Sequence, residues 1–307
     1  MENTTSVGEI LTMERLKVTN ESSVPVFVIL LLIYIFIVVS NFGLVVLIVR
    51  TRSLQQPMYL LLCNMSINDV FGATIVVPQI LSDLLISDSE RLIRYGDCAV
   101  QAFCVHLHAS ASHTVLMIMA FDRYVAICRP LRYAGVMTGG TVAVLSASAW
   151  GTASLMVAIL VGLSIRLSQC RSVISNLFCD NASLVKLSCE NVLINQVYGL
   201  GYTVVLLGSS MGSVVVTYLR IAAVCLRSKN KSMNGRALRT CGTHLAVYVI
   251  LLVSGFLIVI LHRFPQLAEH RKVGHVALPA LNAIIYGLQI KQVRQKIMAL
   301  LQNNKVT

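Results

Sequence analysis

The charged side chains with the clearest chemical potential stand where the surrounding sequence is apolar. Asp69 is the only Asp, Glu, Lys or Arg in residues 58–82, and Asp122 with Arg123 follows an uncharged run over residues 99–121. An acid inside a bilayer costs roughly 2.5–3.5 kcal/mol on insertion scales, so Asp69 is expected to face the protein interior. A carboxylate beside a permanently charged guanidinium can form an ion pair, which makes Asp122-Arg123 a candidate switch.

A second set of candidate residues repeats at helical spacing before this pair. Residues three and four apart lie on the same face of a helix, so such a stripe predicts one ligand-contacting surface. The stripe consists of Gln101, Cys104, Val105, His108 and Ser112. It contains no acid, which disfavours a cationic amine as ligand. His106 lies one residue off the stripe, and a single membrane histidine is more often a packing residue than a ligand contact.

No arrangement typical of an enzyme accompanies these residues. The histidines of the apolar segments lack metal-type spacing with acids, and no Ser-His-Asp arrangement can be placed. We therefore expect no catalytic activity, no catalytic metal and no cofactor.

The elements that position these residues are long apolar segments. Of 307 residues, 56% are apolar and 12% are charged, against roughly 25% charged in soluble domains. A helix crosses the hydrocarbon layer in about 20 apolar residues, and helices satisfy their own backbone groups inside lipid. The sequence predicts an all-α membrane protein, a single seven-helix bundle over residues 24–290. The expected helices are 24–49, 58–82, 98–121, 134–165, 191–219, 240–262 and 273–290.

The distribution of charge predicts the orientation of this bundle. With the N-terminus outside, 15 of the 25 Lys and Arg residues fall on the cytoplasmic side, whereas 11 of the 13 Asp and Glu residues lie outside or at the outer rim. Cytoplasmic Lys and Arg fix topology by the positive-inside rule. We therefore attribute the net charge of +12 to insertion into the lipid bilayer and not to nucleic-acid binding. A multi-pass protein of the plasma membrane is expected.

The two ends of the chain have different characters. Residues 1–23 are polar, lack the apolar core of a signal peptide and are expected to form an extracellular tail. On this tail, Asn3 and Asn20 are the favoured glycosylation sites, while Asn181 fits the same tripeptide pattern less well because its loop is cross-linked. Residues 291–307 are expected to be cytoplasmic and to begin with a short amphipathic helix on the inner leaflet.

The nine cysteines divide by compartment. In this topology four lie outside, where thiols oxidise, and they allow three pairings that spacing alone does not distinguish. The four are Cys98, Cys170, Cys179 and Cys189. Any of these pairings would hold the external loop between residues 166 and 193 over the bundle by disulfide bonds.

One uninterrupted string carries a family resemblance. Residues 119–133 read Met-Ala-Phe-Asp-Arg-Tyr-Val-Ala-Ile-Cys-Arg-Pro-Leu-Arg-Tyr, and further matches are Ser40-Asn41, Pro57-Met58-Tyr59, Phe178-Cys179-Asp180, Lys186-Leu187-Ser188-Cys189, Thr240-Cys241-Gly242-Thr243-His244 and Pro279-Ala280-Leu281-Asn282. Together they resemble the odorant receptors, a branch of the rhodopsin-like G-protein-coupled receptors, over about residues 24–300. Phe121 and His262-Arg263-Phe264 favour the fish-like class I group.

The resemblance implies a small odorant as ligand and a heterotrimeric G protein of the olfactory, stimulatory type that raises cyclic AMP. It implies that Arg123 pairs with Asp122 at rest and turns toward the G protein when the sixth helix moves outward; the alternative is an arginine that only anchors the helix at the membrane edge. The other residues to which the family assigns coupling or activation are Tyr124, Tyr218, Asn282 and Tyr286.

The resemblance also adds partners to the outer and central residues. It implies the disulfides Cys98–Cys179 and Cys170–Cys189, and it places Asn41 and Asn282 beside Asp69, with sodium or water among them. A protonated Asp69 that only joins helices is the alternative. Arg263 would stand at the outer end of the sixth helix and pair with a carboxylic acid or another anionic ligand, although an arginine at a membrane interface needs no ligand.

Two stretches depart from the family pattern. Ala283 stands where the family usually has proline, so the seventh helix keeps a backbone donor and loses a kink. Residues 235–240 read Gly-Arg-Ala-Leu-Arg-Thr in place of the usual Lys-Ala-Phe-Ser-Thr. The loss of the proline is expected to change the activation geometry or the basal activity.

Two other classes of membrane protein fit less well. A transporter or channel usually shows paired repeats and broken helices at the midplane, and neither is visible. A retinal pigment needs a lysine within the seventh helix, but Lys272 precedes that segment and Lys291 follows it.

Overall fold

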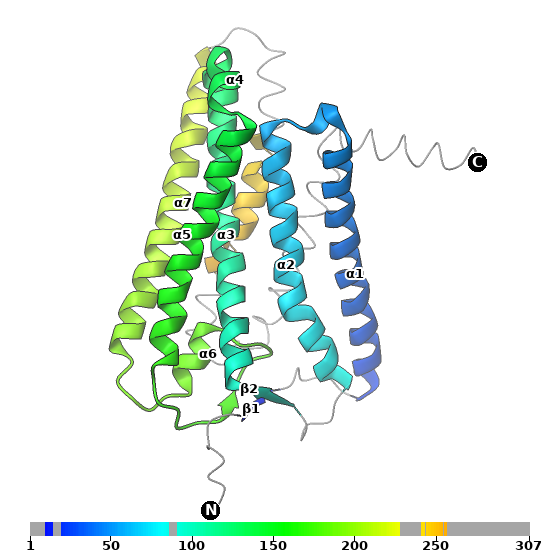
Figure 1. Ribbon diagram of the computed structural model, residues 1–307, viewed down its shortest axis with the longest axis vertical. Coiled ribbons are helices and arrows are strands. Elements are labelled where there is room, and N and C mark those ends of the chain that lie inside the picture. The colour runs from blue at the N-terminus through cyan, green and yellow to red at the C-terminus, as the bar shows by residue number, and fades with distance from the viewer. Residues whose placement is uncertain are drawn as a thin grey trace, which may run out of the picture.

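The protein is mostly helical in the computed structural model, which describes residues 10–14, 20–85, 91–227, 241–242, 244–253 and 255–256. Five helices in this part of the chain are long and apolar enough to cross a membrane. They are α1 (Asn20–Arg50), α2 (Pro57–Leu85), α3 (Tyr95–Cys128), α5 (Gly139–Ile165) and α7 (Leu193–Arg227). Figure 1 shows them running lengthwise beside one another.

Of the two remaining expected spans, the sixth is described in part and the seventh not at all. A shorter apolar helix covers His244–Val253, inside the expected span 240–262. The seventh span and the C-terminal amphipathic helix lie outside the described residues.

The long helices are in most cases longer than hydropathy predicts. The sequence places the third span at 98–121, whereas α3 continues to Cys128 and stops only before Pro130. Hydropathy marks the segment inside hydrocarbon, but helical hydrogen bonding continues into water until a residue such as proline stops it. Likewise α1 starts at Asn20 and α7 runs on to Arg227.

The fourth span expected from the sequence, 134–165, is divided in the structure. The short helices η3 (Pro130–Arg132) and α4 (Tyr133–Val136) come first, and α5 starts only at Gly139. The side chain of Thr138 accepts a hydrogen bond of 3.1 Å from the backbone of Thr141. This N-cap satisfies one of the free donors of the first turn and sets the start of α5.

The helix α3 is the centre of the described bundle. It packs against α2, α5 and α7, while α1 packs on α2. Its inner half belongs to a cluster with Leu61, Val115 and Met119, and its outer half belongs to a second cluster with Ala102, Val157 and Tyr202. The candidate site residues on α3 are therefore surrounded by other helices along most of its length.

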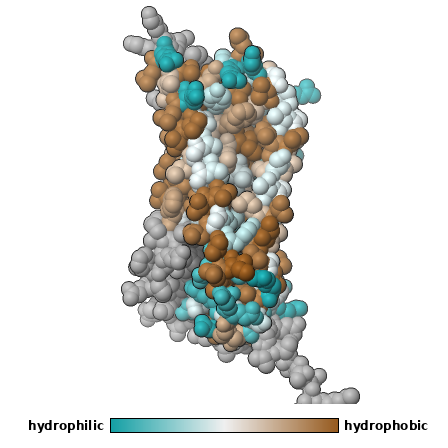
Figure 2. Space-filling model, turned by 90° about the vertical axis from the view of Figure 1, so that its left-hand side faces the viewer, coloured by the Kyte–Doolittle hydropathy of each residue, from teal (hydrophilic) through white to brown (hydrophobic). Residues whose placement is uncertain are grey.

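The outward faces of the long helices are apolar. Side chains such as Leu32, Val144 and Val204 are about two-thirds exposed. Figure 2 shows hydrophilic residues gathered toward the two ends of the molecule and apolar residues between them. Apolar side chains on the outside suit hydrocarbon as the surrounding medium, so a large exposed apolar surface here marks contact with lipid.

A small cap covers one end of the bundle. It contains a three-stranded sheet of order β2-β1-β3, formed by β1 (Ile10–Met13), β2 (Leu92–Arg94) and β3 (Val173–Ile174), and a short helix, α6 (Asn181–Lys186). The strands β1 and β2 are antiparallel, and β1 and β3 are parallel. In Figure 1 the sheet and α6 lie together at the end opposite α4.

The cap corrects the expectation that residues 1–23 are wholly a tail. Residues 10–13 form the central strand of the sheet, and α1 begins at Asn20, before the expected residue 24. Leu11 and Met13 are buried whereas Ile10 is 57% exposed. The alternation fits a half-buried strand, but it is too short a pattern to be recognised without its partner strands.

Candidate functional site

The acid and the arginine at the inner end of α3 form an ion pair. The Nε of Arg123 donates to Oδ2 of Asp122 over 2.9 Å, and its terminal nitrogen contacts the same oxygen. The hydroxyl of Tyr133 donates to the other carboxylate oxygen over 2.9 Å. Asp122 is fully buried, and a buried charge is tolerated when it is paired and hydrogen-bonded in this way.

Tyr133 is the third member of this group, and sequence reasoning did not select it. Burial raises the pKa of the Tyr133 hydroxyl, and the neighbouring negative charge of Asp122 raises it further. The hydroxyl therefore keeps its proton and remains a donor to the carboxylate. Tyr133 ends the family string in the sequence, but only the fold brings it back to α3.

Two of the other expected coupling residues, Tyr124 and Tyr218, pack against the inner cluster of the bundle. The guanidinium of Arg129 lies 5.9 Å from the ring centre of Tyr124. Tyr218 on α7 packs on the inner cluster, and its buried hydroxyl has no hydrogen-bond partner among the described residues. Asn282, Tyr286 and Arg263 lie outside the described residues.

Asp69 and Asn41 are both in the bundle interior. Asp69 is 1% exposed and Asn41 is 2% exposed. The amide nitrogen of Asn41 donates to the carbonyl oxygen of Ile37 in its own helix over 3.0 Å. Since both α1 and α2 bury a polar residue here, the interior position expected for Asp69 is confirmed; sodium or water beside it stays a prediction.

Most of the polar side chains in the predicted ligand stripe are used in packing against α2. The ring of His108 donates from Nδ1 to the carbonyl oxygen of Asn68 over 2.9 Å. In return the amide of Asn68 donates to the carbonyl oxygen of His108 over 3.1 Å and to Oγ of Ser112 over 2.8 Å. These reciprocal bonds join the two helices near the middle of the bundle.

The contact requires a glycine opposite the histidine. A Cβ added at Gly72 would lie 2.4 Å from Nδ1 of His108, far inside van der Waals contact. The missing side chain leaves a notch in α2 that the imidazole fills, which allows the close approach of the two helices.

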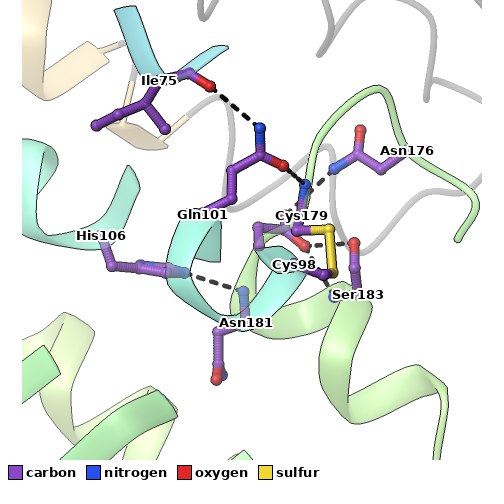
Figure 3. The surroundings of a disulfide bond; sticks show 9 residues. Ile75, Cys98, Gln101, His106, Asn176, Cys179, Asn181 and Ser183 are labelled. Atoms are coloured by element: carbon purple, nitrogen blue, oxygen red, sulfur yellow. Dashed lines mark hydrogen bonds between the residues drawn. A yellow bond between two sulfur atoms is a disulfide. The ribbon is translucent and has the colours of Figure 1, made fainter. Parts of the chain in front are cut away.

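Gln101, the outermost residue of the stripe, joins three parts of the fold. Its amide nitrogen donates to the carbonyl oxygen of Ile75 on α2 over 3.1 Å, and its amide oxygen accepts from the backbone N–H of Cys179 over 2.8 Å. Figure 3 shows the side chain between these two groups, next to the disulfide. Val105 packs on the cluster that contains Phe178, and Cys104 is a half-buried free thiol.

The opposite face of α3 carries polar residues outside the predicted stripe, among them His106, which the sequence favours as a packing residue. His106 accepts at Nε2 from the backbone N–H of Asn181 over 3.2 Å, and its ring packs edge-on against Tyr202 of α7. The hydroxyls of Ser110 and Tyr202 are 2.5 Å apart. The available signal was the spacing: His106, Ser110 and His113 repeat at four and three residues, as the chosen stripe does.

The third member of that repeat, His113, contacts α7 and the helix that covers part of the expected sixth span. Nδ1 of His113 lies 3.3 Å from the hydroxyl of Ser210 on α7, and that hydroxyl lies 3.1 Å from the hydroxyl of Tyr248. Tyr248 belongs to the helix His244–Val253. A polar contact thus joins three helices inside the bundle.

Ala109 lies between the two polar faces of α3. It follows Val105 by four residues and His106 by three, and it is exposed although its neighbours Ser110 and Ala111 are buried. Its exposed side chain lies on the arc of α3 between the residues that contact α2 and those that contact α7.

The external loop is held by the two disulfides that the resemblance implies. Cys98 at the start of α3 is bonded to Cys179, and Cys170 is bonded to Cys189. Asp180 caps α6 by accepting from the backbone of Ser183 over 2.7 Å. Next to the second disulfide, hydrogen bonds from Ser168 lower the pKa of the Glu190 carboxyl.

The two candidate glycosylation sites of the tail are placed differently. Asn3 lies outside the described residues, and Asn20 is the first residue of α1. The side chain of Asn181 is committed to the cap, since its amide oxygen accepts from the hydroxyl of Ser164 over 2.7 Å.

Comparison with known proteins places these features in a family. The family model described as "Olfactory receptor" matches residues 30–304. The chain is 30% identical over 285 residues to human olfactory receptor 52D1, covering 89% of this chain and 88% of that receptor. It is 36% identical over 272 residues to mouse olfactory receptor 51E2, covering 85% of this chain and 84% of that receptor.

The fold has a counterpart among solved structures. The crystal structure of squid rhodopsin aligns with a TM-score of 0.71 at 15% identity and covers 92% of this chain and 81% of that one. Rhodopsin is a seven-helix receptor, which confirms the predicted fold class. With the family match over most of its length, the chain belongs to the olfactory receptors, odorant-sensing class A G-protein-coupled receptors that span the membrane several times and are not enzymes.

Proposed function

We propose that this receptor resides in the plasma membrane with its N-terminus outside, binds a small odorant in the outer half of the bundle and activates a stimulatory G protein that raises cyclic AMP. The observation that carries the proposal is the arrangement along α3, which enters the disulfide-bonded cap at one end and carries the Asp122–Arg123 pair at the other. Disulfides persist in oxidising compartments, which supports an external cap. The excess of Lys and Arg at the opposite end supports a cytoplasmic face there.

The ligand is proposed to lie against α3 between Val105 and His106, over Ala109. This arc is supported by the exposed side chain of Ala109 and by two different neighbours, the apolar cluster with Phe178 and the ring of Tyr202. Gln101, His108 and Ser112 are then proposed to shape this site by holding α2 and the loop in place. Cys104 remains a candidate contact at its edge.

The proposed ligand class is a carboxylic acid or another small anion. The support is Arg263 at the outer end of the sixth helix and the lack of any acid among residues 99–121. A guanidinium binds a carboxylate through two parallel hydrogen bonds, which gives both affinity and orientation.

Activation is proposed to break the Asp122–Arg123 pair so that Arg123 meets the G protein, with Tyr124, Tyr218, Asn282 and Tyr286 in the surrounding contacts. Three features of the inner end support this: the pair is compact, Tyr218 has a buried hydroxyl with no partner among the described residues, and Tyr248 joins the sixth helix to α3 and α7. Asn41, Asp69 and Asn282 are proposed to form the polar centre that rearranges, with sodium or water.

A cyclic-AMP reporter in transfected cells tests the ligand class. Straight-chain carboxylic acids and the matched primary alcohols are applied to the unaltered chain, to Arg263→Ala and to Arg271→Ala as the control. We expect acids to activate the unaltered chain and the control, and Arg263→Ala to lose at least about tenfold in potency for acids, since a charge-assisted hydrogen bond contributes about 1.5–3 kcal/mol. Equal potency of acids on both variants would contradict anion binding.

The signalling route is tested in the same cells after deletion of the stimulatory α subunits. A response that disappears on deletion and returns with the olfactory α subunit supports the proposal. A ligand-gated current that persists without any G protein would instead show a channel.

A further inference from the structure

The central strand of the cap comes from the N-terminal segment of the chain. Strand β1 lies between β2, which precedes α3, and β3, which belongs to the long loop. Its backbone donates to both neighbours: the N–H of Met13 to the carbonyl oxygen of Arg91 over 3.1 Å, and the N–H of Thr12 to that of Ser172 over 2.8 Å. Without β1, the two loop segments share no strand pairing.

The inward side chains of β1 extend the core of the bundle. Leu11 is 0% exposed and Met13 is 4% exposed. Both belong to the cluster that contains the disulfide residues Cys98 and Cys179. The same cluster includes residues from the outer parts of α3, α5 and α7, such as Ala99, Leu160 and Tyr202.

We propose that β1 is a strap that closes the cap end of the bundle, and that its release from β2 and β3 admits molecules from outside to the exposed side chain of Ala109. The strap is held by a few backbone hydrogen bonds and two apolar side chains, with no covalent bond of its own to either neighbour. Segments with so few contacts open locally while the rest of a protein stays folded. The two native disulfides would hold the loop in place during such an opening.

The test measures access to position 109 and needs no odorant. A cysteine is introduced as Ala109→Cys in a Cys104→Ser background, and intact cells are treated with a membrane-impermeant biotin-maleimide. The rate of labelling of surface receptor is then compared between Leu11→Asp, which places a charge on the buried side of β1, and Ile10→Asp, which places it on the exposed side.

Leu11→Asp is expected to raise the labelling rate about tenfold or more, because removing one buried leucine from the core shifts a local opening equilibrium by at least that factor. Ile10→Asp is expected to leave the rate unchanged. Equal labelling rates in the two variants, with both expressed at the surface, would overturn the proposal that β1 is a strap.

A second variant covers the case in which Leu11→Asp does not reach the surface. Thr12 and Leu92 are direct partners in the antiparallel pair, and facing positions lie within reach of a disulfide. The pair Thr12→Cys with Leu92→Cys is expected to cross-link and to reduce labelling at position 109. Ile10→Cys with Leu92→Cys, which are not partners, is expected to do neither. Unchanged labelling after cross-linking would contradict the proposal.

Discussion

The contact between His108 and Gly72 shows how a single missing side chain decides where a histidine goes. The imidazole fills the notch over Gly72 and donates to the carbonyl oxygen of Asn68. From the sequence, His108 is as good a ligand contact as any residue of its stripe. Whether His108 packs against α2 or faces a ligand depends on which part of α2 lies opposite it. The spacing of residues within α3 does not contain that information.

Gly72→Ala is therefore expected to destabilise the receptor. The added methyl group would force the histidine or the helices apart, at a cost of about 1–3 kcal/mol for overpacking. The measurement is the melting temperature of detergent-solubilised receptor, together with its surface expression. Gly43→Ala is the control, since a Cβ there meets nothing within 4 Å. Equal melting temperatures of the two variants would contradict the close approach of α2 and α3 at His108.

At the inner end of α3, Asp122→Asn is expected to raise basal cyclic AMP without any odorant. Replacing the buried carboxylate removes charge-assisted hydrogen bonds worth about 1.5–3 kcal/mol from the resting state. The population of the active state then rises by about tenfold for each 1.4 kcal/mol of difference. Tyr133→Phe removes one of these bonds and is expected to give a smaller increase. The pair has no restraining role if basal activity is the same in all three proteins at equal surface expression.

The elements themselves were largely predictable, but their ends and small connections were not. Five expected spans coincide with long helices because a run of about 20 apolar residues crosses a bilayer as a helix. The end of α3 beyond residue 121 and the start of α5 at Gly139 depend on Pro130 and on the cap at Thr138. Strand β1 was missed because strand pairing joins segments that are far apart in the sequence.

Among the elements, the attachment of the loop to α2 and α3 rests on Gln101. Gln101→Leu is expected to remove both bonds and to leave the N–H of Cys179 without its partner, at about 1–3 kcal/mol for a buried orphan group. We expect a lower melting temperature and faster reduction of Cys98–Cys179 by dithiothreitol. Gln101→Glu keeps the acceptor for Cys179 and is expected to lie between the two. An unchanged melting temperature in Gln101→Leu would contradict a stabilising role for Gln101 between the loop and α2.

For the whole molecule, the charge asymmetry and the disulfides point to the same orientation by independent physical routes. The sequence assigns most Lys and Arg residues to the end that carries the Asp122–Arg123 pair, and the two disulfides lie at the end of the cap. The first reflects membrane insertion and the second reflects redox chemistry.

Glycosylation provides the corresponding experiment. The double variant Asn3→Gln, Asn20→Gln is expected to lose its N-linked glycan, seen as a chain whose mobility no longer changes after glycosidase treatment. The control is the unaltered chain, which should shift. Asn230 fits the same tripeptide pattern but lies in a segment expected to be cytoplasmic. Glycan that persists in the double variant but vanishes after Asn230→Gln would place residue 230 outside and reverse the proposed topology.

The grip of α3 on the external loop has a consequence for how such receptors can diversify. Gln101 and His106 of α3 accept two hydrogen bonds from the loop. The donors are the backbone N–H groups of Cys179 and Asn181, not loop side chains. Every residue except proline offers that N–H group. A loop position that serves only through its N–H group can therefore change in size, polarity and charge over generations while these two bonds persist. The surface of the cap can thus change through mutation while its backbone attachment to α3 is kept.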